Sequence, residues 1–154
     1  MLIASLLASA DNIRCQDDTC SSKNRVIETM SHLLAENTEA ISADTIYQGL
    51  LERERLGSTG LGKGVVIPRG LMPGINHTIA AMITLKTPIN YDAPDNKPVD
   101  VIFGLLVPEE GNESHLQNLS RLVTMFRDEE VCQSIRSTTD PETMFDLLLA
   151  IDDD

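Results

Sequence analysis

Apolar side chains recur every three or four residues in several segments of the chain, a spacing that places them on one face of a helix. Most of these segments begin with serine or aspartate, whose side-chain oxygen can accept a hydrogen bond from a free backbone N–H group of the first turn. Asp140 followed by Pro141 is a further start signal, because proline fits the first helical position. The pattern predicts helices over residues 23–35, from Ser42 to Gly57, from Ser114 to Phe126, from Asp128 to Ile135 and from Pro141 onward.

Residues 1–8 are apolar but few, and they lack a basic leader and a long hydrophobic run. We expect an amphipathic first helix or an extended segment that pairs with a strand, and not a signal peptide. No later segment is long enough to span a bilayer.

Branched aliphatic residues are concentrated in three runs, residues 65–67, 78–85 and 99–107, and these runs predict buried strands. Residues 72–76 and 88–98 are rich in proline, asparagine, aspartate or glycine and predict surface loops. Strands that alternate with helices predict a single α/β domain over residues 1–154. We expect a central mixed β-sheet flanked by helices on both faces.

The chain of 154 residues carries 12 basic and 24 acidic side chains, a formal charge of −12. Such a charge disfavours binding to nucleic acid or to anionic lipid and suits a basic protein partner. Because aromatic residues make up only 3% of the chain, the core must be aliphatic. Cys15, Cys20 and Cys132 fit no metal-site spacing and predict reduced thiols, with redox sensing a distant alternative. The acidic residues 152–154 predict a solvated end.

Glycine is concentrated between the second helix and the first strand, at Gly57, Gly60, Gly62 and Gly64. These glycines leave backbone N–H groups uncovered and allow a ligand to approach the main chain. Pro68 then stops the strand, so Arg69 should lie at the strand's end.

Residues 51–64, Leu-Glu-Arg-Glu-Arg-Leu-Gly-Ser-Thr-Gly-Leu-Gly-Lys-Gly, followed by Val-Val-Ile-Pro, resemble the active-site region of the IIA proteins of the bacterial phosphotransferase system. The resemblance covers nearly the whole chain. It is greatest to the nitrogen-regulatory branch, with the mannitol and fructose type as relatives, and it implies the same α/β architecture. The family has Pro-His-Gly where this chain has Pro68-Arg69-Gly70, and that histidine carries the phosphoryl group. The resemblance also implies that Arg53 helps to hold the phosphoryl group, and that His115, in a His-Leu-x-x-Leu-Ser pattern, is the second active-site histidine.

Phosphoryl transfer through a side chain needs a nucleophile with a free lone pair and needs donors around the phosphoryl oxygens. Ser58 and Thr59 offer hydroxyl groups, and the glycine segment around Gly60 offers amides. Arg69 cannot replace the nucleophile, because its guanidinium stays protonated and has no acceptor lone pair. It can, however, bind an anion. The sequence therefore predicts an anion-binding pocket that is not phosphorylated at the usual position.

Two arginines in one small site repel each other unless an anion, or a carboxylate such as Glu54, lies between them. We therefore expect either a bound anion or an Arg69 side chain that is displaced from the site.

Three functional hypotheses follow from the sequence. The first is a cytoplasmic regulatory protein that keeps the IIA fold and acts by binding target proteins. By the resemblance, its partners would be the histidine phosphocarrier protein and regulated proteins such as sensor kinases or potassium-uptake proteins, and it would need no metal or organic cofactor. The second is an ordinary phosphocarrier in which Arg69 is a variant or engineered replacement. The third is a carrier that uses His115 or His77 instead.

Overall fold

The computed structural model describes residues 2–109 and 112–152. Within them, one six-stranded sheet has the order β1-β5-β6-β3-β2, and β4 also pairs with β6. β5 and β6 are antiparallel, whereas β1 is parallel to β5, and both β3 and β4 are parallel to β6. The sheet is therefore mixed, as the sequence predicts. Its strands are β1 (Ile13–Asp17), β2 (Gly60–Gly62), β3 (Val65–Val66), β4 (Arg69–Met72), β5 (Ile79–Ile89) and β6 (Val99–Pro108).

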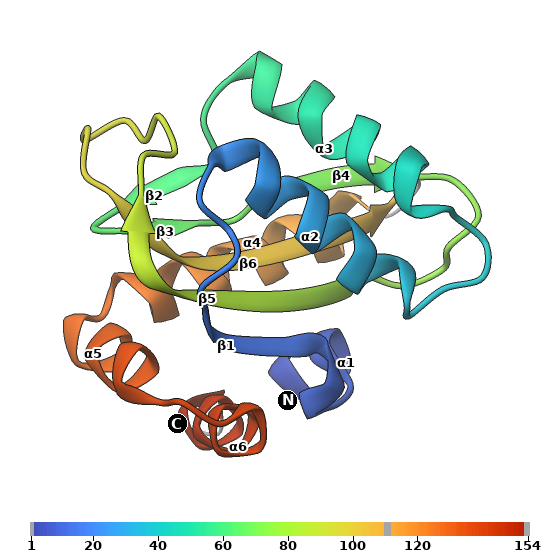
Figure 1. The fold of residues 1–154 in the computed structure, drawn as a ribbon. Coiled ribbons are helices and arrows are strands. Elements are labelled where there is room, and N and C mark those ends of the chain that lie inside the picture. The colour runs from blue at the N-terminus through green and yellow to red at the C-terminus, as the bar shows by residue number, and fades with distance from the viewer. Residues whose placement is uncertain (1, 110–111, 153–154) are drawn as a thin grey trace.

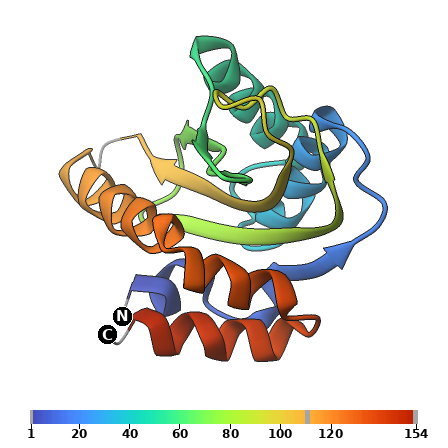
Figure 2. The same ribbon diagram turned by 90° about the vertical axis from the view of Figure 1, so that its left-hand side faces the viewer.

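Helices cover both faces of the sheet (Figure 1). α2 and α3 lie on one face, and α1, α4, α5 and α6 lie on the other, so that Figure 2 shows three layers. This arrangement confirms the predicted architecture. The helices are α1 (Leu2–Leu7), α2 (Lys23–Ala35), α3 (Ala43–Leu56), α4 (Asn112–Arg127), α5 (Glu129–Ser137) and α6 (Pro141–Asp152), with a short 3-10 turn at Ala10–Asn12.

The predicted helix boundaries are close to the observed ones because side-chain caps fix them locally. Ser22 accepts a hydrogen bond from the N–H of Arg25, and Ser42 accepts one from the N–H of Thr45. Residues 2–7 adopt the helical one of the two expected conformations. No helix in the described part of the chain is both long and apolar enough to cross a bilayer.

Two aliphatic cores lie on opposite faces of the sheet, because successive side chains of a strand point to opposite sides. Ala81 and Ile83 of β5 contribute to the core beneath α2 and α3. Ala80 and Met82 contribute to the core beneath the other four helices. Both strands that form the centre of the sheet, β5 and β6, are thus buried on both faces over most of their length.

β3 and β4 pair with consecutive parts of β6, and residues 67–68 separate the two strands. Val66 pairs with Ile102 and Arg69 pairs with Leu105, so the register is the same on both sides of the break. The carbonyl of Pro68 still accepts a hydrogen bond from the N–H of Leu105, at 2.9 Å, although proline itself has no N–H to donate. The sequence predicts that Arg69 lies at the end of the strand that Pro68 stops; instead, Arg69 is the first residue of the next strand, β4.

Two other predicted surface segments are part of the packed structure. Met72, predicted in a surface loop, is the last residue of β4 and is buried. Asp152, predicted to be solvated, has a buried side chain that accepts a hydrogen bond from the N–H of Ile3 at 3.0 Å and pairs with Arg121 at 3.3 Å. These contacts place α1 beside α6. Residues 153 and 154 lie outside the described residues.

The glycine segment is more ordered than an open loop. Gly60–Gly62 forms β2, which pairs antiparallel with β3 across a turn at Lys63 and Gly64, both with positive φ angles of 57° and 87°. The N–H of Lys63 donates to the carboxylate of Asp95 at 2.9 Å. Several backbone groups that the sequence suggested would be uncovered are therefore engaged within the protein.

α3 approaches β4 closely because glycines face each other at the contact. A Cβ added to Gly70 would lie 3.4 Å from the backbone carbonyl carbon of Gly49 and 3.3 Å from Cε of Met72. Gly49 lies on α3, and the Met72 side chain of β4 also packs against it, so the absence of side chains at both glycines allows the helix to lie close to β4.

We expect Gly70→Val to lower the free energy of unfolding by about 1–3 kcal/mol, because its extra methyl groups must enter space held by the α3 backbone. Leu71→Val is the control, since the Leu71 side chain is exposed and its truncation should change stability by no more than about 0.5 kcal/mol. Urea unfolding measures both. Equal effects of the two substitutions would contradict the close approach.

Candidate functional site

Three residues that the sequence singles out meet at one pocket of about 380 Å³. Arg53 comes from the last turn of α3, Arg69 from the first position of β4 and His115 from the first turn of α4. In Figure 1, α3 runs along β4 on one face of the sheet, and α4 lies behind β6 on the other. The pocket therefore lies where the two helical layers meet beside β4. Its remaining lining is Gly49, Glu52, Leu56, Gly70, Leu71 and Val107.

The Arg69 side chain is half-buried, and its Nη1 donates a hydrogen bond to the carbonyl oxygen of Ile67 at 3.0 Å. Burial lowers the pKa of its guanidinium, and the positive charge of Arg53 lowers it further, whereas Glu54 raises it. The group remains charged at neutral pH, since arginine is not deprotonated in proteins. Among the described residues, no carboxylate forms an ion pair with Arg69.

Arg53 lies at the negative end of the α3 dipole. Its Nη1 donates to the carbonyl oxygen of Gly57 at 2.9 Å, which satisfies one of the free carbonyl groups at the helix end. This contact is the structural role expected of a cation there. It engages one nitrogen of the guanidinium and leaves the Arg53 side chain on the pocket wall.

His115 is half-buried, and its Nδ1 is buried without a hydrogen-bond partner among the described residues. Burial lowers the pKa of its imidazole, and the positive charge of Arg69 lowers it further. Since the ordinary pKa of histidine is already about 6.5, the ring is neutral at pH 7. One ring nitrogen therefore carries a free lone pair.

Ser58, Thr59 and Gly60 do not line this pocket. The Ser58 hydroxyl accepts a hydrogen bond from the N–H of Gly60 at 3.1 Å, and the buried Thr59 hydroxyl donates to the carboxylate of Glu54. These side chains order the glycine segment beside Arg53. Their contact with an anion stays a prediction.

Glu54 does not lie between the two arginines as an ion-pair partner, as we considered from the sequence. Its carboxylate binds Thr59 and pairs with Nζ of Lys23 at 3.4 Å. The same Lys23 nitrogen lies 4.9 Å from the centre of the Tyr91 ring. Burial raises the pKa of the Tyr91 hydroxyl, and the nearby charge of Glu54 raises it further.

The cluster of Lys23, Glu54, Thr59 and Tyr91 joins α2, α3, the glycine segment and the loop before β6. We call it the Glu54 cluster. Sequence analysis missed Lys23 and Tyr91, because they lie far from Glu54 along the chain and no local pattern links them. It noted Glu54 only as a carboxylate close to the arginines.

His77, the alternative nucleophile, lies elsewhere. Its side chain is exposed, its Nδ1 lies 2.7 Å from the side-chain oxygen of Asn76, and it lines two other surface hollows with Gly74 and Ile75. The pocket therefore brings together Arg53, Arg69 and His115 but not His77.

Known proteins share both the sequence and the fold of this chain. The family model for the EIIA 2 component of the phosphoenolpyruvate-dependent sugar phosphotransferase system matches residues 6–151. The nitrogen regulatory protein of Pseudomonas aeruginosa is 37% identical over 130 residues, 84% of this chain and 84% of the relative.

Two solved structures show the same architecture. The crystal structure of the nitrogen regulatory protein IIA-Ntr from Neisseria meningitidis has a TM-score of 0.89 and 36% identity, covering 96% of this chain and 99% of its own. Enzyme IIA of the Escherichia coli mannitol system, solved with phosphorylated enzyme IIB, has a TM-score of 0.74 and 20% identity over 92% of this chain and 96% of its own. Both structures confirm the predicted fold, and the first also agrees with the predicted branch.

We expect Glu54→Gln to lower the free energy of unfolding by about 1–3 kcal/mol, because it removes a buried charge from Lys23 and weakens the hydrogen bond from Thr59. The control is Glu28→Gln. Glu28 pairs with Arg25 at 3.1 Å, but both side chains are about half exposed, so its loss should cost less than about 1 kcal/mol. Urea unfolding of both variants measures the difference, and equal losses would contradict a structural role for the Glu54 cluster.

We expect Arg69→Gln to raise the pKa of His115 toward its ordinary value, because the substitution removes the neighbouring positive charge. Burial should keep the pKa somewhat below about 6.5. A pH titration followed by NMR of the imidazole resonances measures the shift. His77 is the internal reference, and an Arg69→Gln variant in which His115 titrates as before would show that the two side chains are too far apart to interact.

Proposed function

The chain belongs to the EIIA 2 family of the phosphoenolpyruvate-dependent sugar phosphotransferase system, and from that premise we propose that it is a regulatory protein that acts by binding partner proteins. We further propose that it does so without phosphorylation at the family's usual position. The observation that carries the proposal is the place of Arg69, which lines the same pocket as Arg53 and His115.

Arg69 has the wrong chemistry for a phosphoryl acceptor. A nucleophile must offer a lone pair, and the guanidinium offers only N–H donors. Its position in the pocket favours a different role, the binding of a negative group beside Arg53. Ser58, Thr59 and Gly60 would then support this site indirectly, by ordering the segment that follows Arg53.

The name of one relative supports a regulatory role, and a complex formed by a protein of the same fold supports action through a binding partner. The chain is 37% identical to a protein named for nitrogen regulation. A more distant protein of the same fold, the mannitol IIA, has been seen bound to a partner of its own system. We propose that the partners of this chain are regulated proteins, such as sensor kinases or potassium-uptake proteins, in addition to the histidine phosphocarrier protein.

A second candidate function is a phosphocarrier that uses His115. One observation favours it: the imidazole is neutral, and its buried Nδ1 has no hydrogen-bond partner among the described residues. In such a transfer the other ring nitrogen of His115 would attack the phosphorus carried by the histidine phosphocarrier protein, and the bond from that phosphorus to the donor imidazole would break as the donor leaves. The positive charge of Arg69 would stabilise the transferred group.

Phosphorylation separates these functions. The chain is incubated with phosphoenolpyruvate, the first enzyme of the phosphotransferase system and the histidine phosphocarrier protein, and its mass is then measured. We expect no phosphate adduct on the chain as it stands, and an adduct on Arg69→His. Arg55→His is the control, because Arg55 is an exposed residue of α3 outside the pocket.

Two outcomes would contradict the proposal. An adduct on the unchanged chain that disappears in His115→Ala would assign the carrier function to His115. If Arg69→His stays unlabelled, the rest of the site has also lost the capacity to accept a phosphoryl group, and Arg69 is not the sole reason that the chain is not phosphorylated.

A further inference from the structure

Two large exposed apolar side chains line the Arg53–Arg69 pocket, and a third follows a pocket residue along α4. Among the described residues, the exposed large hydrophobic side chains are Leu56 at 85%, Leu71 at 59% and Leu116 at 63%. Leu56 and Leu71 line the pocket itself, and Leu116 follows His115 on α4. Exposed apolar side chains scattered over a surface need no explanation, but Leu56 and Leu71 come from two separate elements and line one pocket.

Two cations, Arg53 and Arg69, lie beside these side chains, and neither has a carboxylate within ion-pair distance in the described part of the chain. One nitrogen of each guanidinium donates a hydrogen bond to a backbone carbonyl oxygen. They are close enough for Arg53 to lower the pKa of Arg69. His115 adds no charge at neutral pH, and Glu52 is the carboxylate that lines the pocket.

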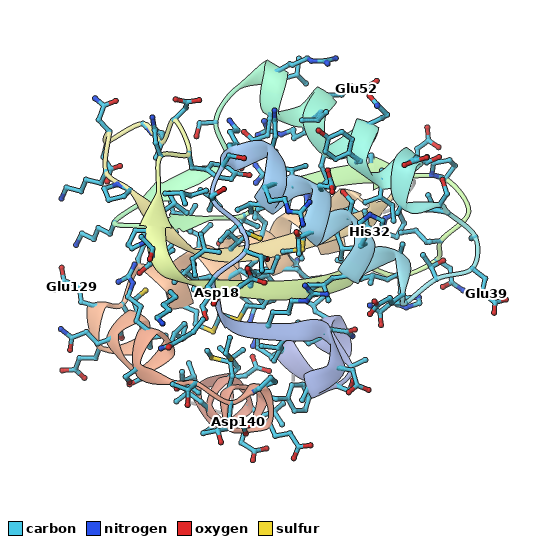
Figure 3. All side chains as sticks on the ribbon, in the orientation of Figure 1. Asp18, His32, Glu39, Glu52, Glu129 and Asp140 are labelled. Atoms are coloured by element: carbon cyan, nitrogen blue, oxygen red, sulfur yellow. The ribbon has the colours of Figure 1, made fainter. Side chains whose placement is uncertain are left out.

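Acidic side chains occur on several parts of the surface outside this pocket. The chain has a net charge of −12, and Figure 3 shows Asp18, Glu39, Glu129 and Asp140 spread around the outside of the molecule. Glu52 is also exposed and lies on α3 near the upper end of the same view. Two neighbouring arginines without an ion pair among the described residues are therefore unusual on an acidic protein.

From these observations we propose that the Arg53–Arg69 pocket binds a segment of a partner protein that places an aspartate or glutamate side chain between apolar side chains. The carboxylate would bind the two guanidinium groups, and the apolar neighbours would cover Leu56, Leu71 and Leu116. This inference rests on the proposed function, because it names the chemistry of the partner that the regulatory site would bind.

The surroundings favour this occupant over others. A free phosphate ion would satisfy the arginines but would leave the three leucines exposed to water. A nucleic acid would be repelled by the overall charge, and so would a second copy of this acidic chain. A carboxylate matches the planar fork of arginine and can accept two parallel hydrogen bonds from it.

The test selects peptide ligands from a random library, so it does not assume a particular partner sequence. A library of random 12-residue peptides displayed on phage is selected on the immobilised full-length chain, and the strongest binder is synthesised. We expect an acidic residue flanked by leucine, isoleucine, valine or phenylalanine. Replacing that acidic residue by its amide should weaken binding about tenfold or more, since charge-assisted hydrogen bonds are the strong ones.

Variants then locate the site. Arg69→Gln should remove most of the preference for the acidic peptide over its amide, and Leu71→Ser should weaken both peptides. Arg55→Gln is the matched control, because it removes a positive charge from the same helix outside the pocket, and it should leave the preference unchanged. NMR spectra of these variants check that each remains folded.

Several results would overturn the inference. They are selected peptides without an acidic residue, equal affinity for the amide version, or equal losses in Arg69→Gln and Arg55→Gln. Inorganic phosphate that binds the pocket more tightly than the peptide would assign the site to a free anion. Concentration-dependent dimers that disappear in Leu71→Ser would assign the surface to a second copy.

The failures of this inference and of the proposed function are distinguishable. A phosphate adduct on the unchanged chain contradicts the proposed function, whatever peptides are selected. Absence of acidic peptides contradicts this inference, whatever the phosphorylation assay gives.

Discussion

The parallel pairing of residues 65–72 with β6 is the constraint on which the candidate site depends. It holds one register from Val65 to Met72 even though Pro68 interrupts it. Because β6 is the central strand, buried on both faces, its position is fixed by both cores at once. The backbone of Arg69 is therefore fixed by its pairing with β6. A residue in a surface loop would not be held in this way.

The site is then completed by elements from the two opposite faces of the sheet. α3 brings Arg53 from one face, and α4 brings His115 from the other. Glycines at the contact between α3 and β4 set the distance on one side. The Glu54 cluster stabilises the end of α3 and the glycine segment. The relative positions of Arg53, Arg69 and His115 therefore depend on the packing of both cores.

Local chemistry in the sequence accounts for what could be predicted. Ser22, Ser42 and Asp128 cap helices through contacts within three residues, so the helix starts were correct. The alternation of strands and helices was sufficient for the α/β architecture. Motif order along the chain, supported by a family resemblance, indicated that Arg53, Arg69 and His115 belong to one site.

What could not be predicted depends on contacts between distant segments. That Arg69 begins a strand follows from its pairing with Leu105, and no residue near Arg69 signals this. The engagement of Glu54 by Lys23 and the burial of Asp152 against Ile3 likewise join residues far apart in sequence. A glycine-rich segment looks open in sequence, yet hydrogen bonds to Asp95 and across the β2–β3 hairpin order it.

The backbone contact between Gly49 and Gly70 has a consequence for how the pocket meets a ligand. Since α3 and β4 approach closely there, with the Met72 side chain packed against Gly49, the backbone positions that carry the two arginines are set by the folded core and not by a ligand. Folding therefore brings two like charges together at a cost in free energy. An anion that binds between them would remove this repulsion without a change in the main chain. An anion bound as we propose would meet a preorganised pocket, and thermodynamic linkage would then require that ligand to stabilise the whole domain.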